Sequence, residues 1–323
     1  MSILKYKYKP YMSNIDKKIA IAIPSYQNRY NSKYFHLLYN VQNFDKEFDV
    51  YVFLSEDDDK LQEYYDSIEQ NDHVHLIVTN CKTIFEKRQY MLDYLSDKGY
   101  NGYFQFDDDV RYAAYKIDET TKRTTSDTYR FYSCDMNEML HKMLDTAQKY
   151  DAGYVSVIRW GYIAWQQPGK VSLNRTINPA QIGYFSIDKI NQYNLKYDTS
   201  GYINEDLDLV IQMFQNKINT CTVCDYMFQT LNITYKEQEK STVSTNIGNT
   251  VTLYLHEFIK YHLKLVVDKN GVIRARINMP KYWGTKELPD ISDSYNQGLL
   301  KLCEAEDVEG VKRYILEHKN NKN

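Results

Sequence analysis

The sequence predicts an α/β fold in which a mainly parallel central sheet is flanked by helices and is followed by a C-terminal hairpin and a helical extension. Three observations lead to this fold class. Strand and helix patterns alternate through the first two thirds of the chain. An Asn270-Gly271 hairpin signal follows them. The length of 323 residues fits one large α/β domain with appended elements.

The first two thirds supply the alternating elements. Apolar runs predict strands at residues 18–24, 49–54, 73–78, 102–106 and 153–158, and helical spacing predicts helices at 60–69, 83–95 and 136–149. This order is typical of a doubly wound sheet that binds a nucleotide. A short strand from Ile182, a helix beginning at residues 204–206 and a strand near 219–224 are expected next.

The last third has a different pattern. Residues 254–262 are expected to be helical, and strands at 263–267 and 272–277 flank Asp268-Lys269-Asn270-Gly271, where Asn-Gly supplies the positive φ of a tight turn. Residues 299–318 are expected to form a helical pair. We therefore expect one domain over residues 1–285, with halves at 17–150 and 151–285, and a helical extension over 286–323.

Composition limits the classes of protein. The formal net charge is −3, so no global attraction to nucleic acid or to an anionic membrane is expected, although a local basic groove remains open. No apolar run is long enough to span a bilayer, and the first residues lack a secretory signal, so we expect a cytoplasmic protein with no membrane partner. Five scattered cysteines do not indicate a disulfide framework, and Cys221 and Cys224 are interpreted as strand residues.

The strongest local signal is an apolar strand, Gly102–Phe106, that ends in the carboxylates of Asp107, Asp108 and Asp109. In an extended segment Asp107 and Asp109 point the same way, so these two could share one Mg²⁺ or Mn²⁺ ion, a cation that prefers oxygen ligands. Such a metal would neutralise the charge on a leaving diphosphate. The alternative is a solvated acidic turn.

A second acidic run, residues 56–59, also follows a strand. Here Ser55 is expected to cap the next helix, with the acids in its first turn, where the helix dipole favours negative charge. Contact of one of these aspartates with the base or ribose of a nucleotide is the alternative.

Two further segments are placed to meet a nucleotide. Ser25, Tyr26 and Arg29 follow the first strand, and ligands of open α/β sheets collect at the carboxyl ends of strands. Arg88 lies beside Lys87 at the start of a helix, where a bound anion would explain two adjacent cations. The alternatives are a helix-capping loop with a surface arginine and, for the helix, an offset of charge by Glu86.

If a hydroxyl group of an acceptor molecule displaces such a diphosphate, the protein must supply a base for the hydroxyl proton and a surface that binds the acceptor. Asp206, and after it Glu205, are candidates to accept the proton, although acids at a helix start also simply complement the dipole. Arg159, Trp160 and Tyr162 offer a cation and aromatic faces, for which stacking on a sugar or base and ordinary core packing are both open.

Taken in order, these motifs resemble a GT-A glycosyltransferase. The resemblance rests on Ile-Ala-Ile-Pro-Ser-Tyr-Gln at 21–27, Arg88, Phe-Asp-Asp-Asp at 106–109 and Asn-Glu-Asp at 204–206, and it covers roughly residues 17–280. It implies a Rossmann-type GT-A-like fold with a nucleotide-sugar-binding half at 17–150 and an acceptor-binding half at 151–285. Within that fold, the segments Ile-Pro-Ser-Tyr-Gln and Phe-Asp-Asp-Asp are most similar to those of the phage and base-J-type DNA glycosyltransferases, which modify hydroxymethylated pyrimidines.

The resemblance also implies a site and its ligands. A UDP-sugar donor and Mn²⁺ or Mg²⁺ are expected, with Asp206 and Glu205 as catalytic residues. From the resemblance together with the residue patterns above, the residues expected for the donor are Pro24, Ser25, Tyr26, Arg29, Arg88, Gln105, Asp107 and Asp108; those for the acceptor are Arg159, Trp160 and Tyr162; and those for the metal are Asp107, Asp109 and His256. His256 and His262 both fall in the expected helix at 254–262, where His256 could equally be a packed or surface residue. DNA is the expected acceptor, and a saccharide, lipid or protein acceptor, mildly favoured by the acidic pI, is the alternative.

Overall fold

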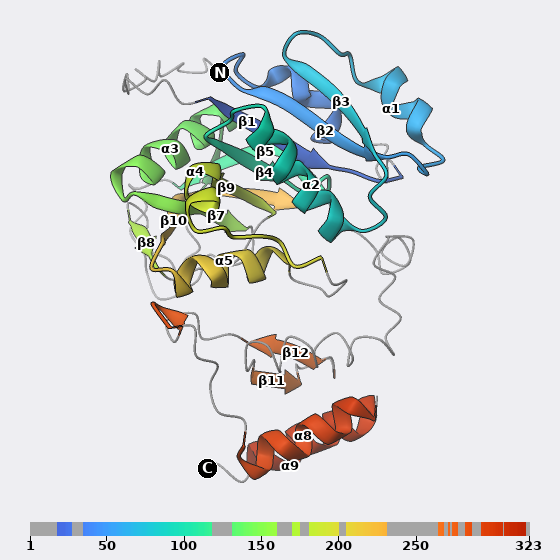
Figure 1. Cartoon of the computed structure of the whole chain (residues 1–323). Helices are drawn as coiled ribbons and strands as arrows, with labels where there is room; N and C mark the ends of the chain where they lie inside the picture. Colours follow the sequence, from blue (N-terminus) through green and yellow to red (C-terminus); the bar gives the residue numbers. More distant parts are fainter. Residues whose placement is uncertain are drawn as a thin grey trace.

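The computed structural model describes residues 18–27, 35–117, 131–159, 170–174, 181–199, 205–230, 264–267, 271, 273–276, 282–285, 292–305 and 307–320. Within them, one mixed sheet has the strand order β3-β2-β1-β4-β9-β7-β10-β5-β6, with β8 paired to β10 (Figure 1). The bounds are β1 Ile19–Pro24, β2 Asp49–Ser55, β3 Val74–Thr79, β4 Gly102–Phe106, β5 Val110–Ile117, β6 Phe131–Cys134, β7 Ala152–Arg159, β8 Val171–Leu173, β9 Ile182–Ser186 and β10 Asn219–Thr230.

The first four strands are all parallel to one another. β1 pairs in parallel with β2 on one side and β4 on the other, and β2 pairs in parallel with β3. Every residue of β1 is buried, as its apolar sequence requires of a central strand. β9 then lies antiparallel between β4 and β7, and β7 pairs in parallel with β10. The α/β class predicted from the sequence is confirmed.

Helices cover both faces of the sheet. One apolar cluster joins the sheet to the short 3-10 helix η1 (Leu38–Asn43), α1 (Leu61–Ser67) and α3 (Met136–Lys149). The other cluster joins it to α2 (Ile84–Asp97), α4 (Ile187–Gln192) and α5 (Glu205–Gln215). The helices expected at 83–95 and 136–149, and a helix beginning near residue 205, are confirmed.

Strands β5, β6 and β8 were not expected from the sequence. β5 has only three buried residues, separated by half-buried ones, and the four residues of β6 are all half-buried or exposed. β8 pairs with the first half of β10, at Cys221–Val223, and β5 pairs with its second half, which extends beyond the expected residue 224, with Tyr226 opposite Lys116. β6 in turn pairs with β5. Pairing with a distant strand, which local periodicity does not report, defines them.

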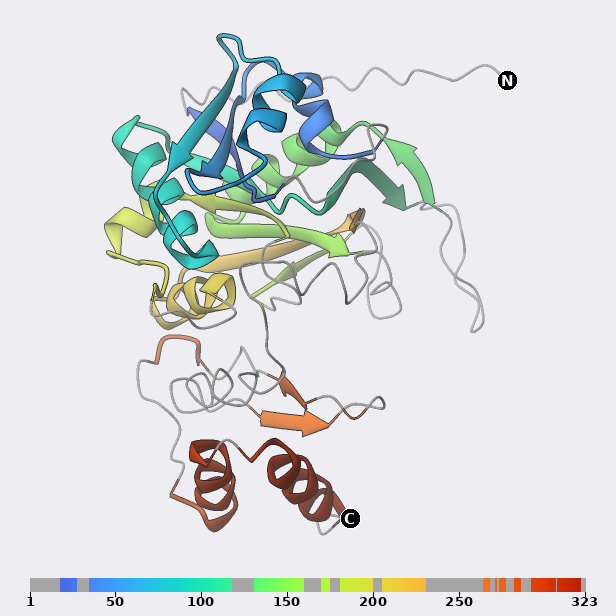
Figure 2. The ribbon, with the colours of Figure 1, turned by 90° about the vertical axis from the view of Figure 1, so that its right-hand side faces the viewer.

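The C-terminal part forms a separate small cluster. β11 (Lys264–Val267) and β12 (Ile273–Arg276) make the expected antiparallel hairpin, with Val267 opposite Ile273. Apolar side chains of this hairpin pack on α8 (Ser294–Glu304) and α9 (Val308–Asn320), which confirm the expected helical pair. Figure 2 shows the hairpin and the two helices on the α5 side of the sheet. The helix expected at 254–262 lies outside the described residues.

A short segment, residues 282–285, contacts helix α5. The amide of Gly284 donates to the carbonyl of Phe214 at 2.9 Å, and the ring of Trp283 meets that of Phe214 edge to face. Within the described part of the chain, no helix is both long and apolar enough to cross a bilayer.

Gly102, at the start of β4, lies close to β9, and it provides a test of this packing. A Cβ atom there would lie 2.6 Å from the hydroxyl of Tyr184 and 2.9 Å from the backbone oxygen of Phe185. We expect Gly102→Ala to lower the free energy of unfolding by about 2 kcal/mol because overpacked cores must shift. Ser133→Ala, in the exposed strand β6, should change it by less than about 0.5 kcal/mol in the same urea titration. Equal stabilities would contradict the contact.

Candidate functional site

The candidate site lies where β1, β2 and β4 end. Because these strands are parallel neighbours, their carboxyl ends meet at one edge of the sheet. Pro24, the last residue of β1, is in register with Phe53 of β2, and the amide of Ser25 donates to the Phe53 carbonyl at 2.9 Å. The loop after β1 therefore begins beside the loops that carry both acidic runs.

The acidic run after β4 is a turn and not the extended segment assumed from the sequence. The amide of Val110 donates to the carbonyl of Asp107 at 3.1 Å, which closes a turn between β4 and β5. The amide of Asp107 donates to the Gln181 carbonyl at 2.9 Å. The assumed geometry was wrong because β5 reverses the chain here. Even so, Asp108 is buried at 5% exposure, whereas Asp107 and Asp109 are half-buried.

Arg88 of α2 binds the first acid of this turn. Its Nη2 lies 2.6 Å from Oδ1 of Asp107, and the side chains are 7% and 25% exposed. A salt bridge with one buried partner and good geometry ties α2 to the acidic turn. The guanidinium expected to attract an anion from solvent thus has a carboxylate of this chain as a partner.

The neighbouring cation, Lys87, reaches the loop after β1. Its Nζ donates to the carbonyl of Ser25 at 2.8 Å, and the side chain is buried. Burial lowers the pKa of Lys87 to about 8, an effect that the nearby carboxylates of Asp108 and Asp58 oppose. The two adjacent cations of α2 therefore bind two different loops. The helix start itself has a capping box between Thr83 and Glu86.

The loop after β1 is held by further side chains. Oγ of Ser25 donates to Oδ2 of Asp108 at 2.8 Å and lies 2.7 Å from the hydroxyl oxygen of Tyr64 in α1. The amide of Gln27 donates to Oδ2 of Asp58 at 2.6 Å. Gln27 has a φ of 62°, in the left-handed region that non-glycine residues seldom adopt. The predicted donor residues Ser25 and Asp108 are thus bonded to each other.

Gln105 occupies the interior beneath this edge. It is fully buried in β4, and its Oε1 accepts from the hydroxyl of Tyr197 at 3.2 Å. The Tyr197 hydroxyl lies 2.9 Å from the Tyr103 hydroxyl. The backbone amide of Tyr197 donates to the side chain of Gln89 in α2 at 2.8 Å. Gln105, expected to contact the donor, therefore bonds a tyrosine from the segment that precedes α5.

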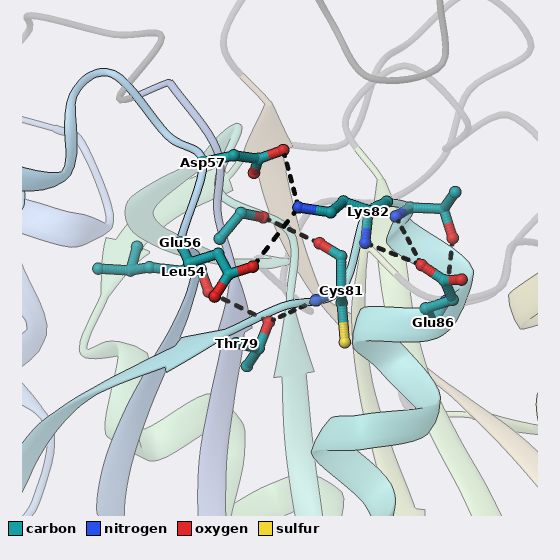
Figure 3. A network of polar contacts seen from close by, with 9 residues as sticks. Leu54, Glu56, Asp57, Thr79, Cys81, Lys82 and Glu86 are labelled. Carbon is teal, nitrogen blue, oxygen red and sulfur yellow. Dashed lines mark hydrogen bonds and ion pairs between the residues drawn. The ribbon is translucent and has the colours of Figure 1, made fainter.

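The second acidic run does not cap a helix, so that expectation was wrong. Ser55 is the last residue of β2, its Oγ donates to the Cys81 carbonyl, and α1 begins only at Leu61 with no side-chain cap. Figure 3 shows the first two acids of the run from close by, with Lys82 beside them. Nζ of Lys82 lies 3.6 Å from Glu56 and 3.4 Å from Asp57. Because both pairs are exposed, they contribute little to stability.

The remaining predicted residues are less fully described. Arg159 ends β7, and its Nη2 donates to Oγ1 of Thr230 at 3.0 Å. Glu205 and Asp206 begin α5, but their side chains lie outside the described residues. Arg29, Trp160, Tyr162 and His256 lie outside them entirely.

Three residues of this site were missed by sequence reasoning: Tyr64, Asp58 as a ligand of the Gln27 amide, and His36. His36 is fully buried just before η1, and its Nδ1 accepts from the amide of Leu38 at 3.1 Å. Burial lowers the pKa of His36 to about 4, against the opposing effect of Asp108. Only the adjacent acids of the second run carried a local signal; Tyr64 and His36 are brought here by long-range packing.

Comparison with known proteins gives a family match and several fold matches. The family model of the TET-associated glycosyltransferases (TAGT) matches residues 19–238, more than half of the chain. A search of curated proteins by sequence finds no match.

The structure of Staphylococcus aureus TarS residues 1–349 in complex with UDP-GlcNAc matches with a TM-score of 0.50 at 10% identity, over 94% of this chain and 92% of that one. This match concerns the fold, and it agrees with the GT-A-like architecture expected from the sequence. The mannosyltransferase PcManGT from Pyrobaculum calidifontis, in complex with GDP-Man and Mn²⁺, matches with a TM-score of 0.48 at 11% identity, over 76% of this chain and 64% of that one.

The buried imidazole of His36 predicts a pH dependence of stability. Its folded pKa of about 4 lies below the ordinary 6.5, so between these values the unfolded chain binds a proton that the folded chain does not. The stability from His36 is therefore complete above pH 6.5 and falls as the pH drops toward 4, by roughly 2–3 kcal/mol.

His36→Asn, which keeps an acceptor for the Leu38 amide, should lose that much less stability between pH 7 and pH 4 in urea titrations. Parallel pH profiles for the two proteins would show that His36 titrates normally.

Proposed function

The chain belongs to the TET-associated glycosyltransferase family, and from this premise we propose that it transfers a sugar from a UDP-sugar to a hydroxymethylated pyrimidine in DNA. It is a glycosyltransferase with a GT-A-like fold. The observation that carries the donor proposal is the acidic turn at the end of β4, beside the tethered loop after β1. The DNA acceptor is supported by the family description and by the resemblance of residues 21–27 and 106–109.

The donor set of the acidic turn fits a divalent metal. Asp107 and Asp109 offer carboxylate oxygens, the ligands that Mg²⁺ and Mn²⁺ prefer, and both side chains are half-buried on one turn. In this proposal these two residues hold the ion, and the ion, when bound, neutralises the charge that develops on the diphosphate. His256 remains the proposed third protein ligand. Arg88, paired to Asp107, holds that carboxylate in place on the turn.

The other proposed roles follow from position. Pro24, Ser25 and Tyr26 lie at the carboxyl end of β1, where ligands of such sheets bind, and with Arg29 they form the proposed contact to the nucleotide. Asp206, with Glu205 beside it, begins α5 and is proposed to accept the proton of the attacking hydroxyl. Arg159, Trp160 and Tyr162 are proposed to contact the acceptor.

The acceptor is tested by transfer of labelled sugar. With Mn²⁺ and a panel of UDP-sugars, we expect label to enter duplex DNA that contains 5-hydroxymethylcytosine or 5-hydroxymethyluracil. The same duplex with unmodified bases is the control and should take up none, because it lacks the primary hydroxyl that attacks the sugar. Efficient transfer to a glycan, lipid or protein, with no transfer to either modified DNA, would contradict the proposed DNA acceptor. It would not change the assignment of the chain as a glycosyltransferase.

The metal role is tested by the double substitution Asp107→Asn with Asp109→Asn. We expect kcat to fall by about 10³ or more, because the charge on the leaving diphosphate is no longer neutralised. Asp93→Asn removes an exposed carboxylate from α2 and should leave turnover unchanged. Circular dichroism checks the fold of each variant. If the double variant retained metal-dependent turnover, the metal would have to be bound by other residues.

A further inference from the structure

Ser25, in the loop Pro24–Gln27, is bonded by side chains from three other segments of the chain. Ser25 bonds Asp108 of the β4–β5 turn and Tyr64 of α1 through its hydroxyl, and Lys87 of α2 through its carbonyl. All four side chains are buried, with exposures of 5% or less. Since the single Ser25 proton is donated to Asp108, the Tyr64 hydroxyl donates to Ser25.

Asp108 differs from its two neighbours in what it faces. Its Oδ2 accepts from a buried serine, and its charge acts on buried Lys87, whereas Asp107 and Asp109 remain half-buried. A buried carboxylate is costly unless hydrogen bonds and opposite charge compensate it. A hydrogen bond and an opposite charge that compensate Asp108 thus come from Ser25 and Lys87, which both hold the loop.

The end of the loop is held in an unfavourable backbone conformation. Gln27 has a φ of 62°, which costs about 1 kcal/mol for a residue with a Cβ. Its amide donates to Asp58, whose other oxygen accepts from the amide of Lys60. Such a conformation persists only when its surroundings over-determine it, and a loop fixed before binding loses less entropy when a ligand arrives.

We infer that Asp108 is a positioning residue that presets the loop Pro24–Gln27 for the nucleotide through Ser25, and that it is not a ligand of the metal. The inference rests on the proposed function, because it assigns the loop a nucleotide as its ligand. It divides the acidic triplet by role: the outer two acids serve the metal, and the middle acid serves the loop.

The test compares Ser25→Ala, Ser25→Thr and Asp108→Asn with Asp66→Asn, an exposed acid of α1 that serves as the control. Calorimetry with UDP in saturating Mn²⁺ should show an increase in Kd of about tenfold for Ser25→Ala and Asp108→Asn, with near-normal binding restored in Ser25→Thr. The double variant Ser25→Ala with Asp108→Asn should be no weaker than the poorer single variant, because both act on the same charge-assisted hydrogen bond: Ser25→Ala removes its donor, and Asp108→Asn removes the charge of its acceptor. If the losses of UDP affinity in the two single variants added up in the double variant, the two residues would not act through the Ser25–Asp108 hydrogen bond.

A titration with Mn²⁺ separates positioning from metal binding. In the positioning role, Asp108→Asn keeps the Mn²⁺ affinity of the wild type within twofold, and added Mn²⁺ does not restore UDP binding. A tenfold loss of Mn²⁺ affinity, or recovery of UDP binding in excess Mn²⁺, would overturn the inference. If Asp108→Asn does not fold, the Ser25→Ala and Ser25→Thr pair still decides the role of the hydroxyl.

Hydrogen exchange separates failure of this inference from failure of the proposed function. In ligand-free protein, the Gln27 amide should exchange at least tenfold faster in Ser25→Ala and Asp108→Asn, while the amides within β1 keep their rates. Unchanged exchange at Gln27 would overturn the positioning role. A wild-type protein that binds no UDP would refute the nucleotide site, and the exchange rates would still decide whether Asp108 orders the loop.

Discussion

The parallel pairing of β1 between β2 and β4 is the constraint on which the site depends. Parallel neighbours end at the same edge of a sheet, so this pairing brings together three loops that follow residues 24, 55 and 106 and are therefore far apart in sequence. The pairing is fixed by burial: every side chain of β1 is inside, and a shift by one residue would exchange the residues that pack against the two helical layers. The burial of the apolar strand β1 therefore determines where the three polar loops lie.

Helix α2 bonds two of the loops at this edge. Lys87 and Arg88 are consecutive, and consecutive helical residues point about 100° apart, so they reach different loops. Lys87 binds the carbonyl of Ser25, and Arg88 binds Asp107. The capping box of Thr83 and Glu86 fixes where the helix begins and thereby the direction of both cations. A pair of cations that opposes the helix dipole is compensated by groups of the chain itself.

The sequence predicted what is local and missed what is long-range. The apolar runs predicted the parallel strands, and the Asn270-Gly271 turn predicted the β11–β12 hairpin, because both depend on neighbouring residues. The strand β5 and the partner of Arg88 were not predictable from spacing, since each depends on residues brought together by the fold. The acidic turn illustrates the limit. Its position after β4 was correct, but the reversal into β5 changed its geometry.

The two acidic runs prove to be equivalent in one respect that their sequences conceal. Each follows a strand that neighbours β1, and each contains one buried carboxylate among exposed or half-buried ones: Asp108 after β4 and Asp58 after β2. Asp108 binds the hydroxyl of Ser25, and Asp58 binds the amide of Gln27. The loop after β1 is therefore held from both sides by the loops of its two strand neighbours. Buried carboxylates require hydrogen-bond partners. The contacts that compensate the buried acid of each run are therefore the same contacts that hold the loop after β1 in place.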